Sequence, residues 1–88
     1  MKPIDKNKTF KKYYKARIAP NPKIVKQFDS RILAFAKGER GHPLYYHPLG
    51  DDKLGLRAFS VAGDLRVVYR ETDDAYIFLD VGSHNQVY

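Results

Sequence analysis

The stretch LGLRAFSVAGDLRVVYRETDDAYIFLDV, residues 54–81, decides the fold of this 88-residue chain. Apolar β-branched and aromatic residues recur in it at every second position, which is the period of a β-strand with two unlike faces. The runs predict three strands, at 54–61, 65–71 and 75–81, separated by 62–64 and 72–74, which have the composition of hairpin turns. We therefore expect an antiparallel meander.

Strict alternation assigns a face to each residue of the second and third strands. The two faces are Leu65, Val67 and Tyr69 against Arg66, Val68 and Arg70 in the second strand, and Ala75, Ile77, Leu79 and Val81 against Tyr76, Phe78 and Asp80 in the third. We expect one face to lie against helices and the other to present arginine and aromatic side chains.

A first amphipathic helix is expected near residues 7–18. Its apolar residues Phe10, Tyr13, Tyr14 and Ile18 have the i, i+3, i+4, i+8 spacing of one helix face, and lysines occupy much of the remaining surface. The pattern predicts a helix with a basic outer side.

A second helix follows, with clear signals at both ends. Asn21 suits the N-cap, Pro22 suits the first helical position, and Gly38 supplies a left-handed exit after Lys37. Its apolar face comprises Ile24, Val25, Phe28, Ile32, Phe35 and Ala36. Residues 39–52 predict an irregular connector, and residues 2–5 predict a short first strand. The expected fold is α+β in the order βααβββ, with two N-terminal helices packed on a small antiparallel sheet in a single domain, 1–88.

Composition excludes several classes of protein. The absence of cysteine removes disulfides, thiol nucleophiles and thiolate metal sites. No apolar run approaches the roughly 18 residues of a membrane span, and the N-terminus lacks a signal peptide's apolar stretch, so we expect a cytoplasmic protein with no membrane partner.

The net charge of +6 is unevenly placed along the chain. Residues 1–26 carry eight lysines and one arginine against one acid, whereas residues 27–88 carry seven basic and nine acidic residues. Such a basic block is typical of contact with a polyanion or an acidic partner protein, and equally of a solvated helix face.

Few side chains are candidates for chemistry. They are His42, His47, Lys53, Arg57, Ser60, Asp64, Arg66, His84 and Tyr88. The sequence lacks the common motifs for nucleotide phosphates, zinc proteases and acyl transfer. The spacing of the three histidines matches no compact metal site, so we expect no metal and no cofactor.

Cleavage of RNA by its own 2′-hydroxyl suits these residue types. It needs a base near the 2′-oxygen, an acid near the leaving 5′-oxygen, and cations that stabilise charge on the phosphate. Histidine serves as acid or base near neutral pH, and arginine binds phosphate. Taken singly, the same residues are also explained as exposed turn histidines and salt-bridged strand arginines.

Three segments of the chain resemble one family. They are HPLGDDKLGLR at 47–57, VAGDLRVVY at 61–69 and DVGSHNQVY at 80–88. In order and spacing they resemble the C-terminal half of RelE/ParE superfamily toxins, and most of all the YafQ-like ribosome-dependent mRNA interferases. The resemblance spans residues 47–88 without gaps, and the helix pair before it fits the family's layout.

The resemblance implies a RelE-like fold with a short C-terminal helical turn. It implies a type II toxin–antitoxin system toxin, an endoribonuclease that cleaves mRNA in the ribosomal A site without a metal and so inhibits translation. The implied partners are mRNA, the 70S ribosome with its rRNA, and a cognate antitoxin that neutralises the toxin. No small-molecule cofactor is implied.

By the same resemblance five residues are catalytic: His47, Asp64, Arg66, His84 and Tyr88. His84 would protonate the leaving oxygen, and His47 or Asp64 would activate the 2′-hydroxyl. Arg66 would hold the phosphate, and Tyr88 would stack on or orient a substrate base.

Three further cations, Lys53, Arg57 and Arg70, are candidate phosphate contacts to mRNA or rRNA. Two positions depart from the family pattern: Ser60 stands where YafQ-like enzymes carry another histidine, and Ala58 stands where they carry an acid. Serine is no general acid or base near neutral pH, so either the two remaining histidines suffice or activity is reduced. A variant closer to RelE, in which arginine and tyrosine carry more of the chemistry, is equally open.

Three other functions remain open at this point. A ParE-like toxin would inhibit DNA gyrase and cleave nothing. His47, Asp64 and His84 argue against it, because that branch needs no acid and base pair. A catalytically degenerate toxin would act only by binding an antitoxin, which the serine at position 60 allows. An unrelated RNA-binding α+β module would need an aromatic stacking motif on a central strand, and the sequence shows none.

Overall fold

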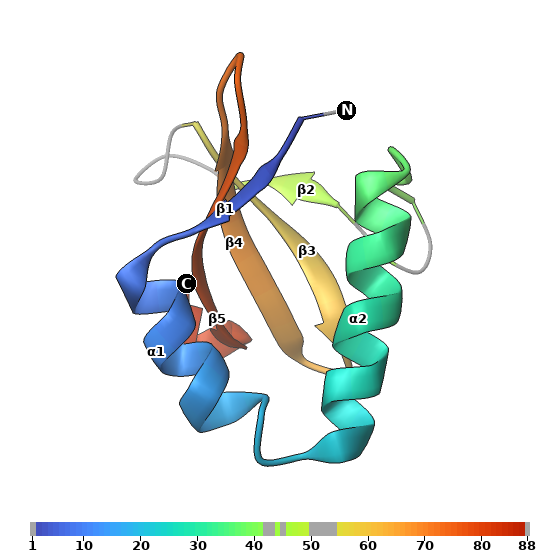
Figure 1. Cartoon of the computed structure of the whole chain (residues 1–88), viewed down its shortest axis with the longest axis vertical. Helices are drawn as coiled ribbons and strands as arrows, with labels where there is room; N and C mark the ends of the chain where they lie inside the picture. The colour runs from blue at the N-terminus through green and yellow to red at the C-terminus, as the bar shows by residue number, and fades with distance from the viewer. Residues whose placement is uncertain (1, 42–43, 45, 50–54, 88) are drawn as a thin grey trace.

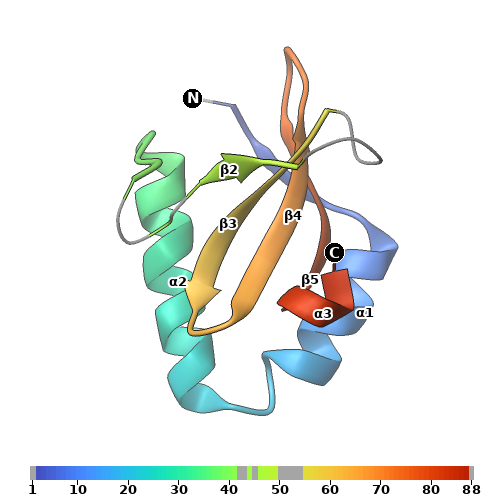
Figure 2. The same cartoon turned by 180° about the vertical axis from the view of Figure 1, so that it is seen from behind.

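The computed structural model describes residues 2–41, 44, 46–49 and 55–87, and of residue 47 the backbone alone. Its elements in chain order are β1 (Ile4–Lys6), α1 (Lys8–Arg17), α2 (Pro22–Ala36), β2 (His47–Pro48), β3 (Leu56–Ala62), β4 (Leu65–Glu71), β5 (Tyr76–Ser83) and α3 (His84–Val87). The strands form one sheet in the order β1-β5-β4-β3-β2, with α1 and α2 on one side and α3 on the other (Figures 1 and 2). The predicted α+β class and helix pair are confirmed.

Local side-chain signals set the helix ends as predicted. Asn7 caps α1, because its Oδ1 accepts a hydrogen bond from the Phe10 N–H at 2.7 Å. Asn21 caps α2 in the same way, and Pro22 occupies the first turn. Gly38, with φ of 93°, takes the left-handed conformation that ends α2.

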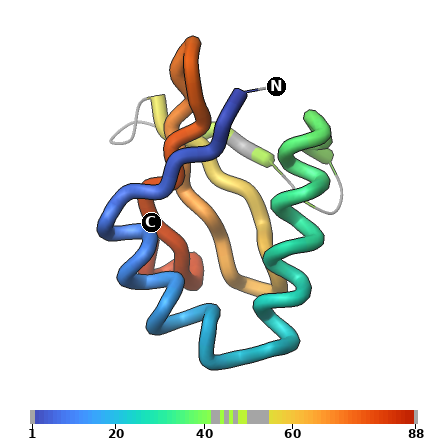
Figure 3. The backbone as a smooth tube through the Cα atoms, viewed as in Figure 1, coloured from blue at the N-terminus to red at the C-terminus, as the bar shows by residue number. Residues whose placement is uncertain are grey.

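The predicted meander is confirmed in β3, β4 and β5, which pair antiparallel. Two strands were not placed correctly. β1 lies at Ile4–Lys6 rather than at 2–5, and it pairs parallel with β5, so the sheet is mixed rather than antiparallel (Figure 3). β2 lies inside the predicted connector and pairs with β3 at the opposite edge.

The alternation predicted for the third strand is wrong, because the register shifts there. Val68 pairs with Asp80 and the next residue, Tyr69, pairs with Phe78, so that Leu79 has no opposite partner. This is a β-bulge, which reverses the faces on one side of it. Consequently Phe78 and Val81 both lie in the core beneath the helices, where strict alternation would put them on opposite faces.

Aromatic rings fill the core between the helices and the sheet. Phe35 of α2 stacks on Phe59 of β3 with ring centroids 4.6 Å apart, and Phe10 of α1 lies 5.4 Å from Phe78 of β5. Leu44, from the connector, is fully buried in the same cluster. The helices therefore cover one face of the sheet and leave the other face available to the rest of the chain.

Candidate functional site

We call the sheet surface turned away from α1 and α2 the outer face. It comprises Ala58 and Ser60 of β3 and Arg66, Val68 and Arg70 of β4. Figure 2 shows this face, with α3 lying across part of it. Val87 of α3 packs on Ala58 and Val68 in a small cluster separate from the main core. This contact fixes α3 beside the end of the sheet where the β3–β4 turn lies.

Asp64 and His84 are brought together at that end. Asp64 lies in the turn after Gly63, whose φ of 51° is in the left-handed region that favours glycine. The backbone N–H of His84, the first residue of α3, donates to Asp64 Oδ2 at 3.4 Å. Both residues are exposed. The turn thus places the Asp64 carboxylate beside the backbone of His84 at the start of α3, although the two residues are 20 positions apart in the sequence.

Arg66 is the second residue of β4, and it pairs with Ser60 of β3 on one side and with Gly82 of β5 on the other. Its Nη1 donates to Gly63 O at 3.0 Å, to Leu65 O at 3.4 Å and to Ser60 Oγ at 3.5 Å. These bonds hold one edge of the guanidinium against the turn. Its other N–H groups have no acceptor among the described residues, and they are the groups that a phosphate would engage.

His47 lies further from this group. Its backbone pairs with Ala58 of β3, and Ser60, two residues further along β3, pairs with Arg66 of β4, so His47 lies two strands and two residues away from Arg66 in the sheet. With strands about 4.8 Å apart and about 3.4 Å per residue, the two Cα atoms are separated by roughly 12 Å. Of the other expected site residues, Lys53 and Tyr88, like the candidate His42, lie outside the described part of the chain.

The two remaining arginines lie on different faces. Arg70 is exposed on the outer face, on the same side of β4 as Arg66. Arg57 instead shares the helix side of the sheet with Tyr69 and pairs with Glu71, its Nη1 lying 2.8 Å from Glu71 Oε1. The structure therefore groups Arg70 with the candidate site and does not group Arg57 with it.

The two departures from the family pattern both lie on the outer face. Ser60 is buried, and its hydroxyl accepts the long hydrogen bond from Arg66. Ala58 is fully buried beneath Val87. An acid at position 58 would lose its hydration in this packing, so the alanine and the docked α3 are mutually consistent.

Sequence reasoning missed Arg17, at the C-terminal end of α1. Its guanidinium stacks on the Tyr13 ring at 3.8 Å, donates to Val81 O at 2.8 Å and lies 3.7 Å from Asp80 Oδ1. It reaches β5 because Gly82 has no side chain: a Cβ there would collide with Arg17 Nη1. The only signal in the sequence was the i, i+4 spacing of tyrosine and arginine, which surface helices show often.

Other kinds of site find no support in the part of the chain that the structure describes. No three histidine, aspartate or glutamate side chains in it gather as metal ligands do. None of its helices has the length and hydropathy needed to cross a membrane.

Comparison with known proteins places the fold. No protein-family model and no curated protein matches the sequence. Among solved structures, a copper-bound mutant toxin from Helicobacter pylori is 24% identical with a TM-score of 0.81, and the alignment covers 100% of both chains. The E. coli DinJ-YafQ complex matches at 20% identity and a TM-score of 0.80, covering 100% of this chain and 99% of that chain. The YoeB dimer from Staphylococcus aureus matches at 17% identity and a TM-score of 0.76, covering 94% and 97%. These likenesses establish that the chain has the RelE-like toxin fold.

Proposed function

We propose that this chain is the toxin of a type II toxin–antitoxin pair and cleaves mRNA in the ribosomal A site without a metal. The observation that carries the proposal is the grouping of Asp64, Arg66 and His84 at one end of the outer face. A carboxylate, a guanidinium and an imidazole can supply the base, the cation and the acid that attack of the 2′-hydroxyl on the neighbouring phosphate requires. The fold shared with YafQ and YoeB supports the same reading.

The reaction uses the RNA's own 2′-hydroxyl as nucleophile. The 2′-oxygen forms a bond to phosphorus as the bond to the 5′-oxygen breaks, which leaves a cyclic phosphate and a free 5′-hydroxyl. His47 or Asp64 takes the proton from the 2′-hydroxyl, and His84 gives a proton to the departing 5′-oxygen. Arg66 stabilises the negative charge that grows on the phosphate, and Tyr88 orients a base.

Arg66 is well prepared for this role. The 3.0 Å hydrogen bond from Nη1 to Gly63 O, with longer contacts to Leu65 O and Ser60 Oγ, holds one edge of the guanidinium against the turn before substrate arrives. A cation held in place beforehand stabilises a transition state more than a mobile one, because no reorganisation is needed during the reaction. Arg70 on the same face and Lys53 would add phosphate contacts along the RNA, and Arg57 would add one only if its ion pair with Glu71 opened.

Partners follow from charge and fold. The basic block in residues 1–26 would bind rRNA phosphates, and such binding weakens steeply with salt. The similarity to YafQ in its complex with DinJ supports a cognate antitoxin for this chain as well. Since an antitoxin has to bind the toxin in the same compartment as the ribosome, we place the activity in the cytoplasm.

A specific observation favours a second candidate, a toxin that binds its antitoxin and cleaves nothing. Ser60 is buried and offers only a weak acceptor to Arg66, and Ala58 is closed off by Val87. The outer face therefore lacks two groups that YafQ-like enzymes carry. A ParE-like gyrase inhibitor is the corresponding alternative if RNA stays intact.

The test is mRNA cleavage in a purified translation system, with the cut positions mapped in the presence and absence of ribosomes. His84→Ala should lower the cleavage rate by about 10²- to 10⁴-fold, since it removes the general acid. Asn85→Ala is the matched control, because Asn85 is the exposed neighbour of His84 in α3 and has no role in the proposed reaction. Cuts that appear without ribosomes would contradict the A-site mechanism, and intact mRNA with the wild-type chain would move the question to gyrase supercoiling.

A further inference from the structure

Two helix arginines bond the ends of the strands that lead into the candidate site. Arg17 of α1 donates from Nη1 to Val81 O of β5 at 2.8 Å, and Arg31 of α2 donates from Nη1 to Val61 O of β3 at 3.0 Å. Each of these valines stands three positions before a proposed catalytic residue. The helices on one side of the sheet therefore contact the backbone that carries the catalytic groups of the outer face.

The Val61 carbonyl lies at an irregular point of the sheet. From Ser60 to Ala62 β3 advances two residues while β4 advances one, so Val61 is the extra residue of a β-bulge. A bulge disrupts the ladder locally, and a partly buried carbonyl there needs a donor from elsewhere. Arg31 supplies that donor. It thereby fixes the end of β3 three residues before Asp64.

The turn that follows the bulge sets the direction of Arg66. Arg66 Nη1 donates to Gly63 O at 3.0 Å, and Gly63 is the second residue after Val61. A change in the bulge would move the Gly63 carbonyl, and the guanidinium bonded to it would move as well. The contact of Arg31 with β3 therefore affects both the carboxylate of the turn and the cation beside it.

The Val81 carbonyl lies beyond the part of β5 that pairs with β1. That pairing runs from Tyr76 to Phe78, and Val81 comes three residues later. Arg17 donates to its carbonyl and also lies so close to the next residue, Gly82, that a Cβ there would collide with Nη1. Since α3 begins two residues after this glycine, Arg17 fixes the backbone from which α3 starts.

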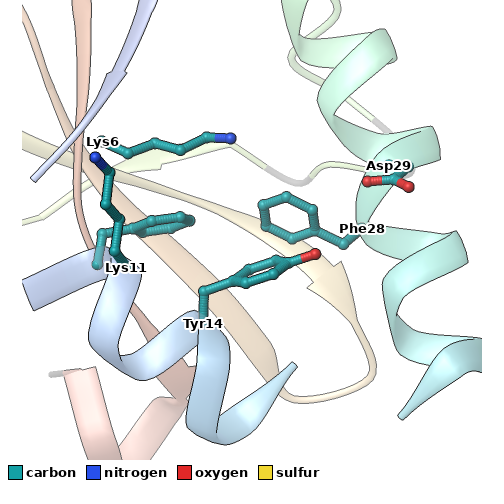
Figure 4. Close-up of a pocket in the computed structure, with 6 residues that line it drawn as sticks. Lys6, Lys11, Tyr14, Phe28 and Asp29 are labelled. Atoms are coloured by element: carbon teal, nitrogen blue, oxygen red, sulfur yellow. The ribbon is translucent and has the colours of Figure 1, made fainter. Parts of the chain in front are cut away.

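One aromatic contact fixes the two helices relative to each other near both arginines. Tyr14 of α1 meets Phe28 of α2 edge-on, with ring centroids 5.0 Å apart, and Figure 4 shows both rings in the space between the helices. Tyr14 stands three residues before Arg17, and Phe28 stands three residues before Arg31, a spacing that makes each pair neighbours on its helix. The ring contact therefore fixes the positions from which both arginines reach the sheet.

We propose that Arg17 and Arg31 are positioning residues for RNA cleavage. Arg31 sets where the turn presents Asp64 and Arg66, and Arg17 sets where α3 presents His84. Neither positioning arginine contacts the RNA. The inference rests on the proposed function, because it concerns the placement of the groups that act on the substrate. Such support matters because a misplacement of about 1 Å costs about 10²-fold in rate.

The first test measures kcat and KM separately, in the purified translation system with the concentration of mRNA-loaded ribosomes varied. Arg17→Met and Arg31→Met each remove the donor and keep an unbranched side chain. Each should lower kcat about 10- to 100-fold per folded molecule, with the folded fraction taken from urea unfolding. A purely structural role would lower the folded fraction and leave kcat per folded molecule unchanged. Because the two variants act on different carbonyls, one of them tests the proposal if the other does not fold.

Two further variants separate the hydrogen bond from the charge. Arg31→Lys keeps a donor for Val61 O, so kcat should stay within about threefold of the wild-type value. Lys37→Met removes one positive charge from the exposed C-terminal end of α2, and kcat should change by less than about twofold. The proposal is overturned if both arginine-to-methionine variants keep kcat within about threefold of the wild type, or if Lys37→Met slows cleavage as much as they do.

Amide hydrogen exchange in the free protein measures the positioning without ribosomes or cleavage. Arg31→Met should speed exchange about five- to tenfold in residues 62–66 and leave residues 82–86 unchanged, and Arg17→Met should do the reverse. Equal acceleration of both segments in both variants would indicate a general loss of stability and overturn the proposal. Intact mRNA with the wild-type chain would instead refute the proposed function, whereas wild-type cleavage without the crossed exchange pattern would refute the positioning role alone.

Discussion

Tyr69 offers a test of how the core of this fold is balanced. Its side chain is fully buried among aromatic rings, and its hydroxyl has no hydrogen-bond partner among the described residues. A buried hydroxyl without a partner costs about 1 to 3 kcal/mol of folding free energy. Tyr69→Phe removes the hydroxyl and keeps the ring, so we expect the free energy of unfolding to rise by about 1 kcal/mol at pH 7 and the melting temperature by about 4–8 °C.

The same burial predicts a signature at alkaline pH. It raises the pKa of the Tyr69 hydroxyl from its ordinary 10.0 to about 12. Between these values the unfolded chain ionises and the folded chain does not, so stability is full below pH 10 and is lost as the pH rises toward 12. The loss amounts to about 2 to 3 kcal/mol. Tyr69→Phe lacks this loss, and its advantage over the wild type should therefore grow above pH 10.

Urea unfolding followed by circular dichroism at pH 7, 10 and 11.5 measures both effects. Tyr76→Phe is the matched control, because the Tyr76 hydroxyl accepts a hydrogen bond from Arg40 Nη2 at 3.3 Å. That variant should lose about 0.5 to 1 kcal/mol at pH 7. A Tyr69→Phe protein that is less stable than the wild type by more than about 1 kcal/mol would refute the reasoning, since it would show that the hydroxyl is satisfied.

Three more outcomes are expected from the site and its surroundings. Gly82→Ala should cost about 1 to 2 kcal/mol in urea unfolding, because the new Cβ would collide both with Arg17, which donates to Val81 O, and with Gln86; an unchanged midpoint would contradict this. Asp64→Asn keeps an acceptor for the His84 N–H, so the free energy of unfolding should change by less than about 0.5 kcal/mol while the rate of RNA cleavage falls about 10²-fold. Undiminished cleavage would assign the base role to His47. The hydrogen bond from the Lys2 ammonium lowers the pKa of Glu71 below its ordinary 4.5, so wild-type stability should fall as the pH drops below 4.5 and Glu71→Gln should show a flatter acid profile; parallel profiles would contradict this.

The helices could be predicted closely because their signals are local. The Asn21 cap depends on a side-chain hydrogen bond to the next turn, and the Pro22 start and the Gly38 exit depend on the backbone preferences of those two residues. The bulge at Leu79 could not be predicted in this way, since it depends on how β4 and β5 align over their whole length. The two-residue β2 was missed for a similar reason: its backbone pairing follows the burial of Leu44, which comes from tertiary packing.

The candidate site shows the same division. Composition alone could not join Asp64 to His84, and only the resemblance to a family placed them together before the structure did. For Arg57, the sequence suggested a phosphate contact but did not show on which face of the sheet the residue lies. Its face depends on the register between β3 and β4, which pairs it with Tyr69 on the helix side and leaves its guanidinium to Glu71.

Arg17 also has a consequence for how the protein behaves at high concentration. β1 covers the edge of β5 only from Tyr76 to Phe78, so within the part of the chain that the structure describes the later backbone groups of β5 border no strand on that side. Bare strand edges recruit strands from other molecules, and proteins commonly block them with an inward-facing charge. The Arg17 guanidinium donates a hydrogen bond to Val81 O and so blocks this part of the edge. The helix that carries it therefore serves colloidal stability as well as the core, and loss of the arginine should show first as aggregation rather than as unfolding.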